Sequence, residues 1–234
     1  MKKQIPNLIT LGNLLCGVLS CYMAAKGFLR PAAIYICLGI FLDFFDGMAA
    51  RLLGVTSPLG KELDSLADVV TSGVAPGIIL FQLSCLSLEG ACSNDIIETA
   101  PYLALLMPLF AAYRLAKFNL DTRQSHSFLG LPAPANALIW VGLALGGTVS
   151  LSPVWIIILL CVSLLTDILM ISELPMFSLK FNFKEMDWRK NSIQYIFLIV
   201  CALIIAATRQ WYAISLIIVW YIILSLFTRK RHHA

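Results

Sequence analysis

The chain has 234 residues, of which 59% are hydrophobic and only 13% charged, with a mean hydropathy of +0.85 and a formal net charge of +4. Soluble globular domains are typically about 45–50% apolar and about 25% charged. This composition excludes a water-soluble domain with a membrane anchor. It favours a protein that is embedded in a bilayer along its whole length.

Long apolar runs divide the chain into eight candidate transmembrane helices, because one span needs about 20 mostly apolar residues. Only helices satisfy the backbone in lipid without closing into a barrel, and the sequence lacks the alternating strands of a barrel. We therefore predict an all-α, polytopic transmembrane helical bundle. The expected spans are roughly 8–28, 32–53, 62–88, 101–120, 132–149, 153–171, 193–208 and 211–227.

The distribution of basic residues predicts the orientation of these spans. With eight spans both termini lie on one side, and 14 of the 17 Lys and Arg residues lie on that side too. The other side holds only Lys26, Arg30 and Arg209. Because Lys and Arg accumulate in cytoplasmic loops, we expect both termini in the cytoplasm. We interpret the aromatic and basic stretch 172–192 as a cytoplasmic loop, either an ordinary one or an interfacial one that lies on anionic lipid.

Residues 42–70 carry the most informative pattern, two pairs of aspartates within apolar helices. The members of one pair are three positions apart and those of the other are four apart, so each pair shares one helix face. Gly, Thr, Ser and Pro residues between the pairs break the helix. We therefore expect an antiparallel hairpin in which the pairs face each other at similar depth. The four residues are Asp43, Asp46, Asp64 and Asp68.

Four carboxylates inside a membrane need a compensating charge, because each costs at least about 2.5–3.5 kcal/mol there. A divalent cation or partial protonation would relieve their repulsion. Oxygen ligands suit Mg²⁺ or Mn²⁺ better than zinc, and two such ions can clamp a phosphoryl displacement. A carboxylate-lined cation pathway is the alternative. Such a pathway needs neither Gly47 beside the second aspartate nor Arg51 one turn further on.

These residues read D-x2-D-G-x2-A-R-x8-G-x3-D-x3-D, which resembles the signature of the CDP-alcohol phosphatidyltransferase family. The resemblance implies an enzyme in which an alcohol attacks a CDP-linked lipid and CMP leaves. It further implies that all four aspartates bind metal, as a site for two Mg²⁺ or Mn²⁺ ions, and that Asp68 is the general base. The residues implied in CDP-lipid binding are Asn7, Thr10, Gly47, Arg51 and Gly60.

Two further segments resemble the branch of this family that uses serine. One is Tyr113 to Asn119, in which Lys117 stands where that branch usually has Arg, and the other is Phe128 to Pro134. A cationic pair on one helix face suits the carboxylate of serine. The acceptor-binding residues implied are Arg114, Lys117 and Asn119. Membrane anchoring by these cations stays open as an alternative.

The resulting expectation is a membrane enzyme of phospholipid biosynthesis, with CDP-diacylglycerol and L-serine as substrates and its active site facing the cytoplasm. Sister enzymes that use glycerol 3-phosphate or an inositol phosphate remain an alternative, and a cation transporter is a more remote one. We expect residues 1–234 to form one domain, with a catalytic part at about 5–135 and accessory spans at about 136–228. The resemblance also implies a homodimer in membrane lipid, and we expect no nucleic-acid partner.

Overall fold

The structure is a computed structural model that describes residues 4–55, 57–88, 98–120, 129–147, 153–176 and 192–228. Within these ranges every regular element is helical, and one isolated antiparallel bridge joins Leu129 to Pro175. The predicted all-α class is therefore confirmed for the described part of the chain.

The helices follow the expected apolar runs closely. The first half of the chain forms α1 (Gln4–Ala25), α2 (Leu29–Leu52), α3 (Pro58–Val69), a π-helical turn η1 (Val70–Val74), α4 (Ala75–Leu88) and a 3₁₀ segment η2 (Ala100–Leu106). The second half forms α6 (Met107–Leu120), α7 (Ala133–Gly146), α8 (Pro153–Ile171), α9 (Ser192–Thr208) and α10 (Ala213–Thr228). The predicted third span is therefore one rod of α3, η1 and α4.

The α2–α3 turn is built by residues whose chemistry stops one helix and starts the next. Gly54 adopts a positive φ of 61°, which glycine tolerates after a helix end. Ser57 then caps α3 by accepting a hydrogen bond of 2.8 Å from the backbone of Gly60. Pro58 occupies the first turn of α3, where its missing N–H is not needed. The turn reverses the chain, and α3 then packs along α1 while its aspartates face those of α2.

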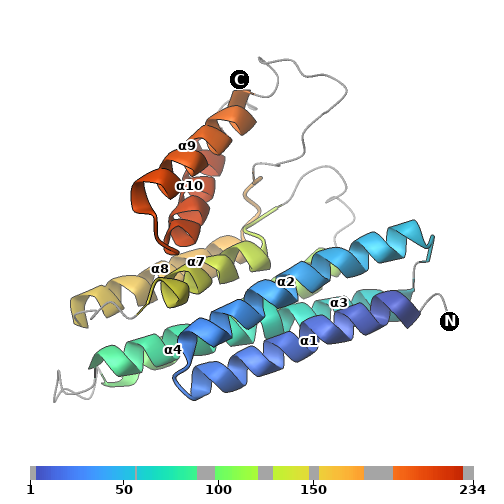
Figure 1. The fold of residues 1–234 in the computed structure, drawn as a ribbon, viewed down its shortest axis with the longest axis horizontal. Helices are drawn as coiled ribbons and strands as arrows, with labels where there is room; N and C mark the ends of the chain where they lie inside the picture. Colours follow the sequence, from blue (N-terminus) through green and yellow to red (C-terminus); the bar gives the residue numbers. More distant parts are fainter. Residues whose placement is uncertain are drawn as a thin grey trace.

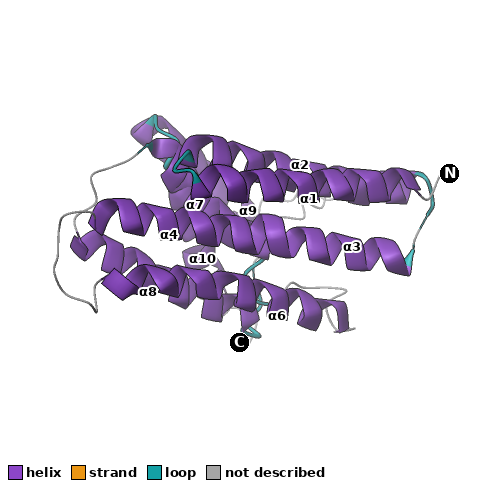
Figure 2. Ribbon diagram, turned by 90° about the horizontal axis from the view of Figure 1, so that it is seen from below, coloured by secondary structure: helices purple, strands orange, loops and turns teal. Residues whose placement is uncertain are grey.

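Most of the helices run along one common direction (Figure 1). Figure 2 shows α1 and α2 on one side of the α3–α4 rod and α6 and α8 on the other. The hairpin of α9 and α10 differs, because it is inclined to the long helices in Figure 1. Its residues pack with those of α6, α7 and α8 in an apolar cluster that includes Met170, Phe197 and Tyr221.

The N-terminal helices approach one another closely where side chains are small. A Cβ on Gly39 of α2 would lie 2.6 Å from Cγ2 of Thr71 and 2.8 Å from Oδ1 of Asn13. Thr71 itself donates a hydrogen bond of 3.2 Å to the backbone oxygen of Asn13. This contact holds α1, α2 and η1 together at the depth of the aspartates.

Five of the described helical segments are long and apolar enough to cross a membrane. They are Gln4–Ala25, Leu29–Leu52, Pro58–Leu86, Ala100–Leu120 and Val154–Ile171. Three more apolar helices, within α7, α9 and α10, are shorter. The chain is therefore an integral membrane protein by the length and composition of its helices. The eight expected spans correspond to eight helical segments, of which these five have full membrane-crossing length.

Candidate active site

Three of the four aspartates converge between α2 and α3. Carboxylate oxygens of Asp43, Asp46 and Asp64 all lie within 4.8 Å of one another. Asp46 is buried and the other two are half-buried. The expectation that the two helices present their aspartates to each other is confirmed for this trio.

This trio fits a divalent cation on the chemistry of its donors. Carboxylate oxygens are the hard ligands that Mg²⁺ and Mn²⁺ prefer. The side chains of Asp43 and Asp64 approach to hydrogen-bonding range, and the charge of Asp46 acts on Asp43 as well. Like charges at this separation inside a membrane are stable only with a counter-cation or a shared proton.

Asp68 lies one helical turn beyond Asp64 on α3 and has different partners. Its Oδ1 accepts a hydrogen bond of 3.3 Å from Nδ2 of Asn13 on α1. Its charge also interacts with that of Arg114 on α6. Asp68 therefore faces both the aspartate trio and the part of α6 where the acceptor residues are expected.

Helix α1 supports the aspartates from the other side. Thr10 donates a hydrogen bond of 2.6 Å to Oδ2 of Asp46 and also approaches the backbone oxygen of Pro6 at 3.1 Å. Asn13 is completely buried, and its Oδ1 has no hydrogen-bond partner within the described residues. The polar residues of the first span thus orient Asp46 and Asp68.

A cavity of about 490 Å³ lies beside the trio, where α1, α2 and α3 meet. Asp46 and Asp64 contribute to its wall. The expected CDP-lipid residues Asn7, Thr10, Gly47 and Gly60 line it as well. The structure therefore brings four of the five residues expected in CDP-lipid binding to one cavity.

The fifth of these residues, Arg51, lies beside the cavity. Its Nε donates a hydrogen bond of 3.2 Å to the backbone oxygen of Gly47, and the side chain is exposed. A Cβ on Gly47 would meet only this guanidinium, at 3.7 Å. Gly60 is more confined, because a Cβ there would lie 3.0 Å from Oδ1 of Asn7. Gly47 leaves open space next to a cation, and Gly60 lets α3 approach Asn7.

Comparison with known proteins agrees with this geometry. The family model described as CDP-alcohol phosphatidyltransferase matches residues 3–166. The chain belongs to the CDP-alcohol phosphatidyltransferase family. The match includes every site residue considered above and ends within α8, before α9 and α10. Members of this family use a divalent metal, which the aspartate trio is suited to bind.

Several curated proteins are similar to this family member over 56–70% of its length. A CDP-diacylglycerol–serine O-phosphatidyltransferase of Bacillus subtilis is 38% identical over 134 residues, which cover 56% of this chain and 69% of that protein. One from Helicobacter pylori strain J99 is 36% identical, covering 58% of this chain and 55% of the relative. An archaetidylserine synthase of Methanothermobacter thermautotrophicus is 31% identical, covering 70% and 68%.

Among the three residues expected to bind the acceptor, Arg114 is the buried one. Its side chain is 8% exposed, and the guanidinium carbon lies 5.3 Å from the ring centre of Phe118. Its guanidinium also lies within electrostatic reach of Asp68, the expected base, without forming an ion pair with it. Arg114 is therefore in position to receive an anionic group close to the aspartates.

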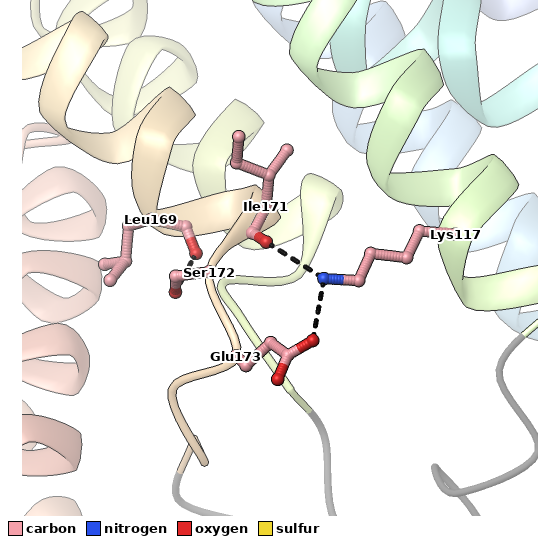
Figure 3. Close-up of polar contacts among 5 residues, drawn as sticks. All are labelled: Lys117, Leu169, Ile171, Ser172 and Glu173. Carbon is pink, nitrogen blue, oxygen red and sulfur yellow. Dashed lines mark hydrogen bonds and ion pairs between the residues drawn. The ribbon is translucent and has the colours of Figure 1, made fainter.

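The two other expected acceptor residues are tied to neighbouring segments. Nζ of Lys117 approaches the backbone oxygen of Ile171 at 3.4 Å and forms an ion pair of 3.2 Å with Glu173, as Figure 3 shows. Asn119 donates a hydrogen bond of 2.7 Å to Ser65 on α3, and its backbone oxygen accepts one of 2.9 Å from Lys61. These contacts hold the end of α6 between α3 and the residues that follow α8.

The turn before α7 is fixed by the end of α8. The backbone of Gly130 donates to Leu174 at 2.8 Å, and that of Leu131 donates to Leu169 at 3.1 Å. Gly130 has a φ of 74°, and a Cβ there would collide with the backbone oxygen of Met170. The turn packs on α8 in this way. Phe128, at the start of the same motif, lies outside the described residues.

Sequence reasoning did not single out Ser65 or Thr71. Ser65 joins α3 to Asn119, and Thr71 joins η1 to α1. The small polar run Thr71, Ser72 and Gly73 in an apolar span was the available signal. π-helical turns of this kind are frequent at functional sites.

Proposed function

We propose that this chain transfers the phosphatidyl group of CDP-diacylglycerol to the hydroxyl of L-serine, which yields phosphatidylserine and CMP. The observation that carries the reaction type is the convergence of Asp43, Asp46 and Asp64 at a cavity between α1, α2 and α3. Serine as acceptor is supported by the names of the relatives from Bacillus and Helicobacter.

In this proposal the trio and Asp68 hold two divalent ions, Mg²⁺ or Mn²⁺. Bound metal supplies positive charge that neutralises the diphosphate and the charge developing on the leaving CMP. Thr10 keeps the Asp46 carboxylate oriented through its hydrogen bond of 2.6 Å. Such support of a ligand by a second residue is a general feature of metal sites.

The CDP part of the lipid would occupy the cavity of about 490 Å³. Gly47 offers backbone without a side chain, so the diphosphate can approach α2 closely. Arg51 stands next to this space and adds a cation for the phosphates. Asn7, Thr10 and Gly60 line the remaining wall.

Asp68 and Arg114 would act on the acceptor. Arg114 receives the serine carboxylate, while Lys117 and Asn119 complete this side through the contacts that hold α6. Asp68 takes the proton of the serine hydroxyl as the hydroxyl oxygen bonds to the lipid-linked phosphorus. In the same displacement the bond between that phosphorus and the bridging oxygen of the diphosphate breaks. This oxygen leaves as part of CMP, so charge and atoms balance.

We further propose eight membrane crossings with both termini and the active site on the cytoplasmic side. The start of α1 and the α2–α3 turn lie at the same end of the bundle in Figure 1, which supports placing the N-terminus and this turn on one side of the membrane. Residues of about 5–135 would form the catalytic part, the spans of about 136–228 an accessory part, and two chains a homodimer. Labelling single introduced cysteines from either side of sealed vesicles tests the topology.

A panel of acceptors tests the reaction. Purified protein is incubated with CDP-diacylglycerol and Mn²⁺ or Mg²⁺, and CMP is measured with L-serine, glycerol 3-phosphate or an inositol phosphate. We expect release with serine alone. Release only with a phosphorylated alcohol would move the chain to a sister activity. Bound CDP-lipid with no release for any acceptor would contradict enzymatic function and would favour the cation pathway.

A further inference from the structure

A second polar feature lies at the opposite end of α2 from the aspartates. Arg30 is in the first turn of this helix, and 13 positions separate it from Asp43. At 1.5 Å per residue this separation is about 20 Å along the helix. Arg30 therefore belongs to the other membrane surface and has no place in the catalytic site.

Arg30 lies between two cavities. One, of about 510 Å³, is lined by residues of α2, the end of α7 and the turn between α9 and α10. The other, of about 390 Å³, adjoins the α1–α2 turn and the end of α4. Ligand pockets in proteins have volumes of roughly 300–1,000 Å³. Both cavities are thus large enough to hold part of a lipid.

The end of α7 is shaped to accept the arginine side chain. Gly147 has a φ of 93°, and a Cβ at that position would lie 2.6 Å from Nη2 of Arg30. The guanidinium therefore packs against bare backbone. Arg30 forms neither a hydrogen bond nor an ion pair with any residue that the structure describes. A cation held in place with its donors unused is suited to bind an anion.

The larger cavity continues from this cation along an apolar wall. Ile34 and Cys37 are four and seven positions after Arg30, so they lie on the same face of α2. Leu145 of α7 and Trp211 of the α9–α10 turn line the same cavity. A charge at the bilayer surface followed by an apolar groove toward the membrane centre matches a phosphate headgroup followed by an acyl chain.

The surroundings favour a lipid with net negative charge. Lys26 lies just after α1 with its ammonium 5.8 Å from the ring centre of Tyr22, and Arg209 lies in the α9–α10 turn. Tryptophan, as at position 211, is enriched where membrane proteins meet the headgroup region. Arg209 and Trp211 flank Gln210 in the wall of the larger cavity and add positive charge and an interfacial anchor there, whereas Lys26 lines neither cavity.

We propose that this groove is a binding site for an anionic glycerophospholipid, with its phosphate on Arg30 and one acyl chain along Ile34, Cys37 and Leu145. The site lies in the leaflet opposite the aspartates. It is distinct from the site that takes CDP-diacylglycerol. An arginine that merely anchored the helix at the surface would need no groove and would not select among headgroups.

Native mass spectrometry of the purified full chain in detergent tests the proposal. Phosphatidylglycerol and phosphatidylcholine are titrated separately, and binding is compared among the wild type, Arg30→Gln and the charge-matched control Lys26→Gln. Lys26 lines neither cavity. We expect preference for phosphatidylglycerol, a loss of about tenfold in affinity in Arg30→Gln, and little change in the control. Equal binding by the wild type and Arg30→Gln, or equal loss in both variants, would overturn the site.

Two further arms identify the ligand. Cys37→Phe fills the groove and keeps every charge, so we expect it to weaken phosphatidylglycerol binding as well. Unchanged affinity in this variant would overturn the acyl-chain assignment. Inorganic phosphate at millimolar concentration should not displace the lipid, and displacement would show a free-phosphate site instead. The readout is binding alone, so it does not depend on the proposed catalytic activity.

Discussion

Thr10 donates a hydrogen bond of 2.6 Å to Asp46, although the two residues are 36 positions apart in the chain. The hydroxyl also lies 3.1 Å from the backbone oxygen of Pro6, as threonine in a helix often does. Helix α1 is therefore part of the metal-binding arrangement that we propose, since it fixes the orientation of a ligand.

Replacing Thr10 with valine removes this hydrogen bond and preserves the shape of the side chain. We expect the Mn²⁺ concentration for half-maximal activity to rise by about 10–100-fold, as for other residues that support metal ligands. The measurement is a Mn²⁺ titration of CMP release. Thr10→Ser keeps the hydroxyl and should stay close to the wild type. An unchanged titration in Thr10→Val would show that the bond does not support metal binding.

Gly47 and Gly39 of α2 give a matched pair of alanine substitutions. A Cβ at Gly47 meets only Arg51 at 3.7 Å, so Gly47→Ala should fold normally and lose affinity for CDP-diacylglycerol. A Cβ at Gly39 would collide with Thr71, so Gly39→Ala should be destabilised by about 1–3 kcal/mol. Thermal unfolding in detergent and the KM for CDP-diacylglycerol separate the two effects. A fully active Gly47→Ala would refute the idea that lipid phosphate occupies this space.

Asp68→Asn tests the proposed base while keeping the size of the side chain. The amide cannot accept the serine proton, and we expect turnover to fall by about 10²–10⁴-fold. Asn13 still has a side-chain oxygen to bond at that position, so the fold should persist. Thermal unfolding and size-exclusion chromatography check the fold. Turnover near that of the wild type would remove Asp68 from this role.

The buried Arg114 and the more exposed Lys117 should respond differently to substitution. Arg114→Lys loses the planar guanidinium that binds a carboxylate with two hydrogen bonds, so the KM for serine should rise by at least about tenfold. Lys117 pairs with Glu173, whose side chain is 60% exposed. Such pairs contribute only about 0–1 kcal/mol, so Lys117→Met and Glu173→Gln should each change the KM by less than about fivefold.

The comparison of these variants also has a clear contrary outcome. A large rise of the serine KM in Lys117→Met but not in Glu173→Gln would mean that the ammonium itself contacts serine. The contact with Glu173 would then have to open during the reaction. Steady-state kinetics with serine as the varied substrate distinguishes the two cases.

The sequence predicts the helices and the convergence of three aspartates well, because both depend on local spacing. Apolar runs set the spans, and Gly54, Ser57 and Pro58 mark the α2–α3 turn. Aspartates three and four positions apart must share a helix face, and the hairpin then brings Asp43, Asp46 and Asp64 together.

Contacts between distant segments are not visible in such patterns. The bond from Asn119 to Ser65 joins residues 54 positions apart, and that from Lys117 to Glu173 joins residues 56 apart. The motif around Lys117 predicts positive charge, but the partner of that charge depends on how α8 packs. For the same reason hydropathy finds α9 and α10 without indicating their inclination to the other helices (Figure 1).

The most direct test of the central claim is the stoichiometry of CMP and phosphatidylserine formed from CDP-diacylglycerol and labelled L-serine, with Mn²⁺ present or removed by chelation. The wild type should form one phosphatidylserine for each CMP, only with metal, and Asp64→Asn should form neither. Metal-independent product, or undiminished product from Asp64→Asn, would contradict a metal-dependent phosphatidyl transfer at the aspartate cluster.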